Sequence, residues 1–350
     1  HMNISVRTIS GMDISFFGTE ELRRLMKEIE EELKSREEKS ERLLPIDLFA
    51  KQARRDIHCP NCGSHDYRTN GTSRKRTVLE CGTCGKKFGY LSGSMMDDSK
   101  LSLLRMYQLT MLILLDLPVW VVSYLTGLNQ KTVQFWRYRL TDVAVEYLGK
   151  QMLSDKVWID ETYWKITDKG LIFVKNDGNL PRGLSGNLIC VIVAYDKKRH
   201  YYCHVVGKRG KISSEDFCSV MKDRIRPGSL LIHDGEHAHK ALVNMLSLKE
   251  EVIRSDDMNP ERRGQMETID SVCALLKFET YKHKGIRTRH MEELLPWFLF
   301  KTEYIRKNGV KNAVEYILTK LFDTEKTETY DERFNTERRK RKGKRVLEDC

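Results

Sequence analysis

The chain has 350 residues, with 61 lysines and arginines against 50 aspartates and glutamates, and a formal net charge of +11. The length allows two or three domains, and the basic excess favours a polyanionic partner, most often nucleic acid. The longest apolar run, Met111 to Val122, is interrupted by Asp116 and Pro118 and is too short to span a bilayer, which argues against a membrane protein.

Nine cysteines are present, four of them in two Cys-X-X-Cys pairs. This usage fits reduced thiols of the cytoplasm better than the disulfide framework of a secreted protein. We also expect no signal peptide, and His1-Met2 resembles the remnant of an expression vector.

The first expected segment, residues 1–50, is a charged helical region. Thr19 to Leu44 is rich in helix formers, with leucine and isoleucine at spacings of three and four. Because only about two heptads are apolar, a solvated helix packed on its neighbour is favoured over a dimerising coiled coil.

Residues 51–97 contain Cys59-Pro-Asn-Cys62 and Cys81-Gly-Thr-Cys84. Two such pairs at this separation supply four thiolates for a tetrahedral, structural Zn²⁺, and the glycine after each pair permits the turn that aims backbone amides at sulfur. Asn70-Gly71 between two short strands is typical of a hairpin turn. The sequence therefore predicts a zinc ribbon. The arm of this ribbon carries basic residues that include Arg74 and Arg76. These side chains could contact phosphate or could simply form a solvated face.

Residues 98–153 are helical by pattern, and Pro118 to Arg139 is typical of a helix-turn-helix. Gly127 lies where the turn is expected, and Asn129 can cap the second helix. That helix would be placed to enter a DNA major groove, although an ordinary helical hairpin is the common alternative. Its candidate DNA-binding side chains are Lys131, Thr132, Gln134, Arg137 and Arg139.

Residues 154–310 follow the order of a mixed sheet flanked by helices. Strands are expected at 156–166, 187–196 and 200–207, then a helix, a buried strand at 229–235, a short strand at 252–254 and a helix at 260–278. This is the layout of an RNase H-like fold. The fold class expected for the whole chain is multidomain α/β, with a helix and a basic tail at 311–350.

Two adjacent acids, Asp160 and Glu161, lie in the middle of the first strand, so their side chains must point to opposite faces. An inward carboxylate is costly unless a positive group such as a metal ion lies beside it, and a solvated edge strand is the alternative. Asp234 ends the fourth strand, which neighbours the first in this layout. Asp160 and Asp234 are therefore expected at one rim of the sheet.

Glu267 and Asp270 lie three residues apart on the last helix and share a face, so either can supply a third carboxylate. Three acids at one point repel each other unless divalent metal neutralises them, and hard oxygen ligands with room for phosphate describe a Mg²⁺ or Mn²⁺ site. Two such ions would clamp an in-line displacement at phosphorus. Lys277, one or two turns further on, is a candidate contact for DNA phosphate. Taken singly, each acid could equally be a surface carboxylate.

The order of zinc ribbon, helix-turn-helix and four short motifs resembles bacterial insertion-sequence transposases with a DDE-type catalytic domain. The motifs are Trp158-Ile-Asp-Glu-Thr162, Pro181-Arg-Gly-Leu-Ser185, Ile232-His-Asp-Gly235 and Ile269-Asp-Ser-Val-Cys-Ala-Leu-Leu-Lys277. The resemblance covers about residues 59–308. It implies metal-dependent cleavage at transposon ends and strand transfer into target DNA, by a dimer or higher assembly on paired ends in the bacterial cytoplasm and nucleoid. It also implies that Asp160 and Asp234 are the first two catalytic acids.

The third acid departs from the family pattern. Related enzymes place Glu or Asn seven residues before the helix lysine, where this chain has Asp270, and some carry Asn where this chain has Glu267. We favour Asp270. His233 and His237 flank Asp234 and are more often structural than in contact with substrate.

Two basic segments follow the last helix of this domain. Lys282 to Arg289 is basic and interrupted by glycine, and it is a candidate phosphate-contacting loop. The tail at 338–345 is expected to bind DNA without sequence specificity. The candidate DNA-binding residues of the loop are Lys284 and Arg287.

Two other functions remain open from the sequence. One is a sequence-specific DNA-binding regulator derived from a transposase, against which the intact Asp160 and Asp234 argue. The other is a structure-selective nuclease of the same fold, which would hydrolyse DNA without joining it. Strand transfer with a pre-cut end would separate a transposase from a nuclease.

Overall fold

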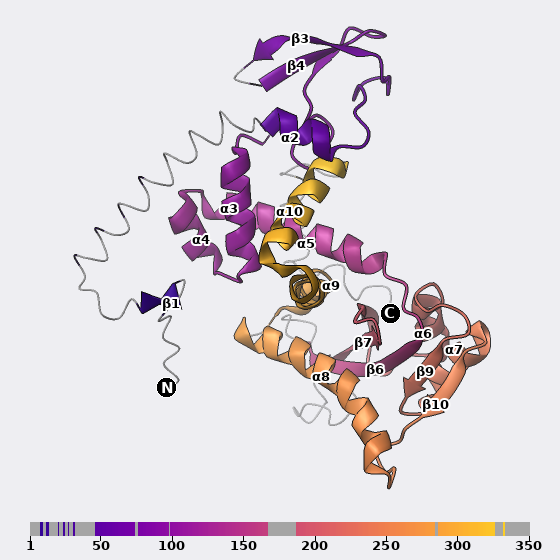
Figure 1. The fold of residues 1–350 in the computed structure, drawn as a ribbon. Helices are drawn as coiled ribbons and strands as arrows, with labels where there is room; N and C mark the ends of the chain where they lie inside the picture. The colour runs from indigo at the N-terminus through magenta and orange to yellow at the C-terminus, as the bar shows by residue number, and fades with distance from the viewer. Residues whose placement is uncertain are drawn as a thin grey trace, which may run out of the picture. The chain divides into compact units, whose positions relative to one another are not determined.

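The structure is a computed structural model that describes residues 46–73, 76–97, 99–166, 187–283 and 286–325, with isolated positions before residue 32 and at residue 332. Contacts divide the chain into two compact units, residues 1–109 with 322–325 and residues 110–321 with 326–350. Figure 1 traces the elements of both. Most of the predicted helix at 19–44 lies outside the described residues, as do Arg74, Lys284, the motif at 181–185 and the basic tail.

The first unit contains a small three-stranded antiparallel sheet that carries the cysteines. Its strands are β3 (Tyr67–Ser73), β4 (Arg76–Cys81) and β5 (Lys87–Phe88), in the order β3-β4-β5. The same unit contains helix α2 (Ile46–Ala53) and two short paired strands, β1 (Thr8–Ile9) and β2 (Met12–Asp13).

The hairpin of this sheet corrects the prediction of a turn at Asn70-Gly71. β3 runs through both residues, and Ser73 still pairs with Arg76, so the chain does not reverse at Asn70. The register shifts between Thr69 and Thr72, and Gly71 has a φ of 73°. A strand irregularity uses a left-handed glycine just as a tight turn does, so the Asn-Gly pair alone cannot separate the two.

The helix-turn-helix forms as predicted. Helix α3 (Leu103–Leu114) is followed by α4 (Val119–Thr126) and α5 (Gln130–Gly149). Gly127 ends α4 with a left-handed φ of 66°, and the Asn129 side chain accepts a hydrogen bond from the Lys131 amide at 2.9 Å. These are the turn glycine and the N-cap that the sequence indicated.

The second unit is organised around a five-stranded mixed sheet in the order β10-β9-β6-β7-β8. β6 pairs antiparallel with β7 and β7 with β8, whereas β9 runs parallel to both β6 and β10. The first and fourth strands are therefore neighbours, as the RNase H-like layout requires. The bounds are β6 (Lys156–Lys165), β7 (Leu188–Asp196), β8 (Tyr201–Arg209), β9 (Leu230–His233) and β10 (Lys249–Val252).

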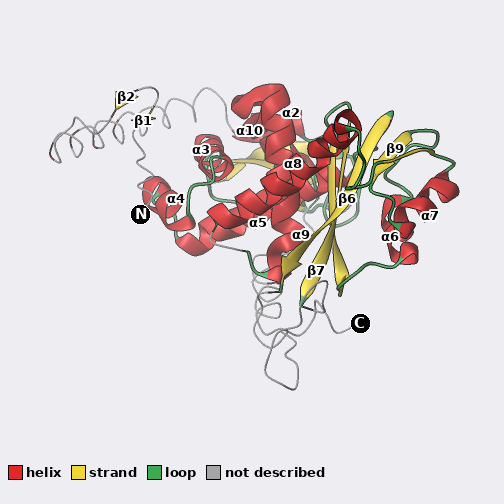
Figure 2. Ribbon diagram, turned by 90° about the horizontal axis from the view of Figure 1, so that it is seen from below, coloured by secondary structure: helices red, strands yellow, loops and turns green. Residues whose placement is uncertain are grey.

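Helices cover both faces of this sheet (Figure 2). Helices α6 (Ser214–Met221) and α7 (His237–Leu246) lie on one face, over a core that includes Val157, Ile159 and Ile192, each 0% exposed. Helices α8 (Pro260–Lys282) and α9 (Met291–Phe300) lie on the other face. The remaining elements are η2 (Thr288–His290), η3 (Lys301–Ile305) and α10 (Arg306–Asp323), and no helix among the described residues is long and apolar enough to cross a membrane.

Candidate active site

The two adjacent acids of β6 point to opposite faces of the sheet, as predicted. Val157 and Ile159 belong to the core under α6 and α7, and Glu161 shares their side. Glu161 Oε1 lies 3.0 Å from Nε2 of His239 on α7. Asp160 instead lines a cavity together with residues of α8. Each face of the sheet therefore receives one carboxylate: Glu161 lies against His239 on one face, and Asp160 lines the cavity on the other.

That cavity has a volume of about 570 Å³ and is lined by all four predicted acids, Asp160, Asp234, Glu267 and Asp270. They come from three separate elements, namely mid-β6, the residue after β9, and α8. Arg254 and Arg263 line the same cavity, and both were missed by sequence reasoning. Arginines at a rim of acids suit a substrate that is itself anionic.

The local sequence fixes where each acid lies. Gly235 follows Asp234 with a φ of 97°, and a Cβ at this position would lie 2.9 Å from Val252 Cγ1, so only glycine fits the turn out of β9. The α8 helix begins at Pro260, where the Asn259 side chain accepts from the amides of Glu261 and Arg262. The position at which α8 begins determines which of its residues face the sheet.

Burial and like charge act together on the acids of the cavity. Burial, and after it the charges of Glu161, Asp234 and Asp270, raise the pKa of Asp160 to about 7. The pKa of Asp270 is raised by burial and by the charge of Glu267. Such a cluster gains from a bound cation, because the cation offsets the burial and repulsion that raise the pKa of Asp160 and Asp270.

Asp270 is electrostatically closer to Asp160 than Glu267 is. Asp270 is among the charges that raise the pKa of Asp160, and the buried Cys273, one turn further along α8, feels both carboxylates. Lys277 lies two turns beyond Asp270, is exposed, and lowers the pKa of Cys273. The face of α8 that meets the sheet is formed by its buried residues, Ile269, Val272, Cys273 and Leu276, and the exposed Asp270 and Lys277 lie along the edge of this face.

His239 holds two of the acids and was not predicted. Its ring is 0% exposed, with Nδ1 3.3 Å from Asp234 Oδ1 and Nε2 3.0 Å from Glu161 Oε1. Burial opposes its protonation, but the two carboxylates outweigh it and raise the pKa of His239 to about 9. The contact in turn lowers the pKa of Asp234. A protonated His239 therefore favours the ionised form of Asp234.

The two histidines singled out from the sequence behave differently. His233 is 0% exposed, its Nδ1 accepts from the Gly235 amide at 3.0 Å, and its Nε2 lies 3.2 Å from Glu250 Oε1. His237 is exposed at the start of α7. His233 is thus part of the turn that carries Asp234, which is the structural role expected for it.

Comparison with known protein families identifies the unit that holds these acids. Residues 152–303 match the family model of the ISXO2-like transposase domain. This segment is a transposase domain. It spans β6 to α9 and includes all four acids of the cavity. No curated protein sequence matches the chain.

Solved structures similar to the chain are related only distantly. An intasome of simian T-cell lymphotropic virus, solved with a PP2A regulatory subunit, shows 12% identity, a TM-score of 0.28, and coverage of 42% of this chain and 48% of that chain. A Mos1 strand transfer complex shows 14% identity, a TM-score of 0.26, and coverage of 64% and 79%. A Mos1 mariner paired-end complex with Mn shows 13% identity, a TM-score of 0.22, and coverage of 59% and 78%. The chain thus spans about half the length of the viral protein.

Outside the transposase domain, the four cysteines of the first unit form one cluster, with their sulfurs within 4.8 Å of one another. The sulfurs of Cys59 and Cys84 are 3.6 Å apart, as are those of Cys62 and Cys81. A zinc tetrahedron with Zn–S bonds of about 2.3 Å has S–S edges of about 3.8 Å, so the cluster fits this ion.

The turns around these sulfurs have the predicted form. Gly63 and Gly85 adopt φ values of 70° and 71°. The Lys86 amide and the Asn61 side chain lower the pKa of Cys84 to about 6, which favours the thiolate. Backbone amides therefore point at sulfur, as the glycine after each pair indicated.

The candidate DNA-binding residues fall into three groups. Lys131 and Lys277 are exposed, and Thr132 is half-buried. Arg76 is held within the first unit, with its guanidinium 3.7 Å from Asp47 Oδ1. Those that face one cavity of the second unit are Gln134, Arg137 and Arg287.

Arg139 departs from its expected role. It is 1% exposed, and its guanidinium lies 5.2 Å from the centre of the Phe135 ring. The helical pattern placed it on the same helix as the basic residues around it, but a helix of this length has a buried side as well as an exposed one. Arg139 is on the buried side and does not present its charge to a groove.

Proposed function

We propose that the chain is the transposase of a bacterial insertion sequence, which cleaves DNA at transposon ends and joins the cut end to target DNA. The observation that carries this proposal is the cavity of the transposase domain, where acids from β6, β9 and α8 meet beside two arginines. Its partners are the double-stranded terminal repeats and the target DNA. Because two ends must be joined, we propose a dimer or a higher assembly.

Asp160, Asp234 and Asp270 would hold the catalytic ions, Mg²⁺ or Mn²⁺, with Glu267 as the alternative third ligand. Carboxylate oxygens are the ligands that these hard cations prefer, and the raised pKa of Asp160 is the mark of a site short of positive charge. When bound, the ions activate a water or a 3′-hydroxyl and stabilise the leaving oxygen of an in-line displacement at phosphorus.

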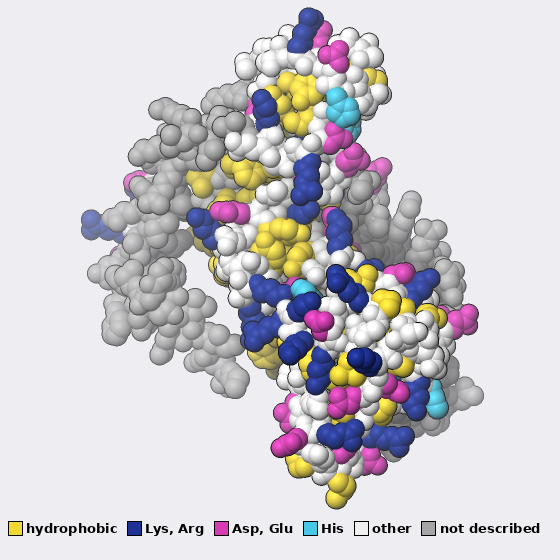
Figure 3. Space-filling model, turned by 45° about the vertical axis from the view of Figure 1, so that its right-hand side comes forward, with side chains coloured by type: hydrophobic (Ala, Val, Ile, Leu, Met, Phe, Trp, Pro, Cys, Tyr) yellow, Lys and Arg dark blue, Asp and Glu magenta, His cyan; other side chains and the backbone are white. Residues whose placement is uncertain are grey.

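The chain's own residues position the DNA and the acids. Arg254 and Arg263 offer fork-shaped donors to the phosphates on either side of the scissile bond. His239 on α7 contacts the Asp234 carboxylate but does not line the cavity, so its role is that of a positioning residue. Lysine and arginine side chains gather over the part of the molecule that holds the five-stranded sheet (Figure 3), in keeping with a polyanionic substrate.

The test is strand transfer with labelled DNA ends, taken from the DNA that flanks the gene, in the presence and absence of Mg²⁺ or Mn²⁺. We expect joined product with either ion and none after chelation. A protein that hydrolyses DNA but never joins a pre-cut end would instead be a nuclease of this fold. Specific binding without cleavage or joining under any of these conditions would point to a regulator.

The third acid can be assigned in the same assay. We expect Asp270→Asn to lower the joining rate about 100-fold or more, because it removes a metal ligand, whereas Glu267→Gln should cost less than about tenfold. Both substitutions keep size and remove one charge from the same face of α8, so each is the control for the other. A larger loss for Glu267→Gln would assign the role to Glu267.

A further inference from the structure

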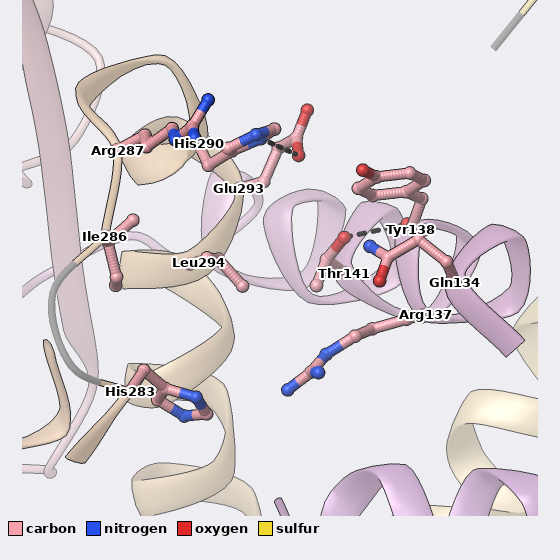
Figure 4. Close-up of a pocket in the computed structure, with 10 residues that line it drawn as sticks. All are labelled: Gln134, Arg137, Tyr138, Thr141, His283, Ile286, Arg287, His290, Glu293 and Leu294. Carbon is pink, nitrogen blue, oxygen red and sulfur yellow. Dashed lines mark hydrogen bonds and ion pairs between the residues drawn. The ribbon is translucent and has the colours of Figure 1, made fainter. Parts of the chain in front are cut away.

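A second cavity of the second unit lies where helix α5 faces the end of α8 and the start of α9. It has a volume of about 520 Å³, and it shares no lining residue with the cavity of the four acids. Gln134 and Arg137 of the helix-turn-helix line one wall, and His283, Arg287 and His290 line the other. Figure 4 shows the Arg137 side chain extending from α5 toward His283.

Two buried nitrogen atoms of this cavity have no hydrogen-bond partner. They are Nε of Arg137 and Nε2 of His283. Burial lowers the pKa of both side chains, but a guanidinium stays charged at neutral pH. Because the Arg137 guanidinium is partly buried and its Nε has no hydrogen bond, a ligand that supplies oxygen acceptors stabilises this arrangement.

The nearby acids do not meet this need. Asp116 attracts Arg137 electrostatically, but Asp116 and Glu279 do not line the cavity, and one oxygen of each contacts Lys301. Glu293, the acid in the wall of the cavity, lies 3.8 Å from His290 Nδ1, and Figure 4 draws the two side by side. Arg287 is exposed and adds a second guanidinium to the cavity. Among the residues that line the cavity, two arginines therefore stand against one carboxylate.

We propose that this cavity is a phosphate-binding pocket that takes one backbone phosphate of the transposon end. The terminal nitrogens of the Arg137 guanidinium bind the phosphate oxygens, and Arg287 adds a second guanidinium from the exposed side. The proposal rests on the proposed function, since the phosphate belongs to the DNA that the transposase cuts. A backbone phosphate is favoured over a free one because Arg137 shares α5 with the exposed Lys131, so one strand can follow the helix into the pocket.

The pocket differs from the role first expected for its residues. Gln134, Arg137, Tyr138 and Thr141 recur at helical spacing and form one face of α5, and this face is turned toward α9 rather than toward solvent. A major groove cannot receive this face. A single phosphate can, because it needs only the volume of the cavity and a few donors.

The test is the salt dependence of DNA binding, measured by fluorescence anisotropy with a labelled terminal-repeat duplex and with a random duplex of equal length. Each phosphate contact contributes about −0.9 to the slope of log K against log salt. We expect Arg137→Gln and Arg287→Gln each to weaken binding of both duplexes about tenfold and to make the slope shallower by about one. Arg137→Lys should recover part of the affinity, because it restores charge without the planar fork.

Arg226→Gln is the matched control, since it removes one exposed arginine that lies outside both cavities. The pocket is refuted if the Arg137 and Arg287 variants keep the slope of this control. Arg287 is exposed, so its variant tests the pocket even where Arg137→Gln fails to fold. Protection of the protein against heating by inorganic phosphate, without any change in DNA binding by the variants, would also overturn the proposal in favour of a free-phosphate site. Binding needs no cleavage, so a failed strand-transfer assay would refute the proposed function and leave this measurement standing.

Discussion

Asp160→Asn should lower the rate of strand transfer by about 10³-fold, which corresponds to about 4 kcal/mol of lost transition-state stabilisation. The change removes one metal-binding charge from the centre of the acid cavity and leaves the size of the side chain unchanged. Duplex binding should persist, because the basic side chains that bind phosphate are untouched. Single-turnover joining of a pre-cut end, beside anisotropy of the same duplex, measures both quantities.

The neighbouring residue supplies the control for this experiment. Glu161→Gln alters the adjacent carboxylate of the same strand, but that side chain faces His239 on the other side of the sheet. A glutamine there can still accept from the imidazole, so we expect a loss below about tenfold. Equal losses for the two variants would mean that the face assignment of β6 is wrong, and with it the identity of the metal ligand.

The acids could be predicted because strand alternation and strand order carry positional information. Asp160 and Glu161 are adjacent in a strand, which fixes that they diverge, and an RNase H-like order makes β6 and β9 neighbours, which brings Asp234 to Asp160. The spacing of Glu267 and Asp270 gave a shared helical face. All four residues line one cavity, so this part of the site follows from periodicity and topology.

The rest of the site depends on contacts between elements that no local pattern encodes. His239 meets Glu161, which lies 78 positions earlier in the chain, only because α7 packs under β6. Arg254 and Arg263 enter the acid cavity through the packing of α8 and the segment after β10. Arg137 and His283 line one cavity because α5 packs on α9, which follows α8 in the chain. Sequence shows which charges exist, but the pairing of helices with a sheet decides which of them face each other.

Local sequence patterns predicted some features of the structure correctly and others wrongly. The Asn129 cap and the Gly127 turn were confirmed, because each needs only its own helix end. Asn70-Gly71 failed, because a left-handed glycine serves a strand irregularity as well as a turn. Arg139 failed because its side of α5 is set by what the helix packs against.

Removal of zinc should unfold the three-stranded sheet of the first unit and leave the transposase domain folded. The buried core around the cysteines consists of Cys59, Leu79, Cys81 and Phe88. Two fully buried apolar side chains contribute only about 3 to 6 kcal/mol, which is too little to order the strands and knuckles around them. Apparent zinc binding to such thiolate sites contributes about 10 to 16 kcal/mol in small zinc-binding peptides, so a zinc ion bound here would supply the larger part of the folding free energy.

Cys62→Ser should therefore abolish stoichiometric zinc and expose the segment from β3 to β5 to limited proteolysis, whereas Cys203→Ser should keep one zinc per chain. Cys203 is buried in β8, away from the cluster, and so controls for the loss of a thiol. Metal analysis after dialysis against a zinc chelator, followed by proteolysis and mass spectrometry, measures both effects. A ribbon that stays protected without zinc would show that its strands are held by other contacts of the first unit. Because the acid cavity prefers hard oxygen-bound ions, we expect Mg²⁺ not to restore the ribbon and zinc not to replace Mg²⁺ in strand transfer.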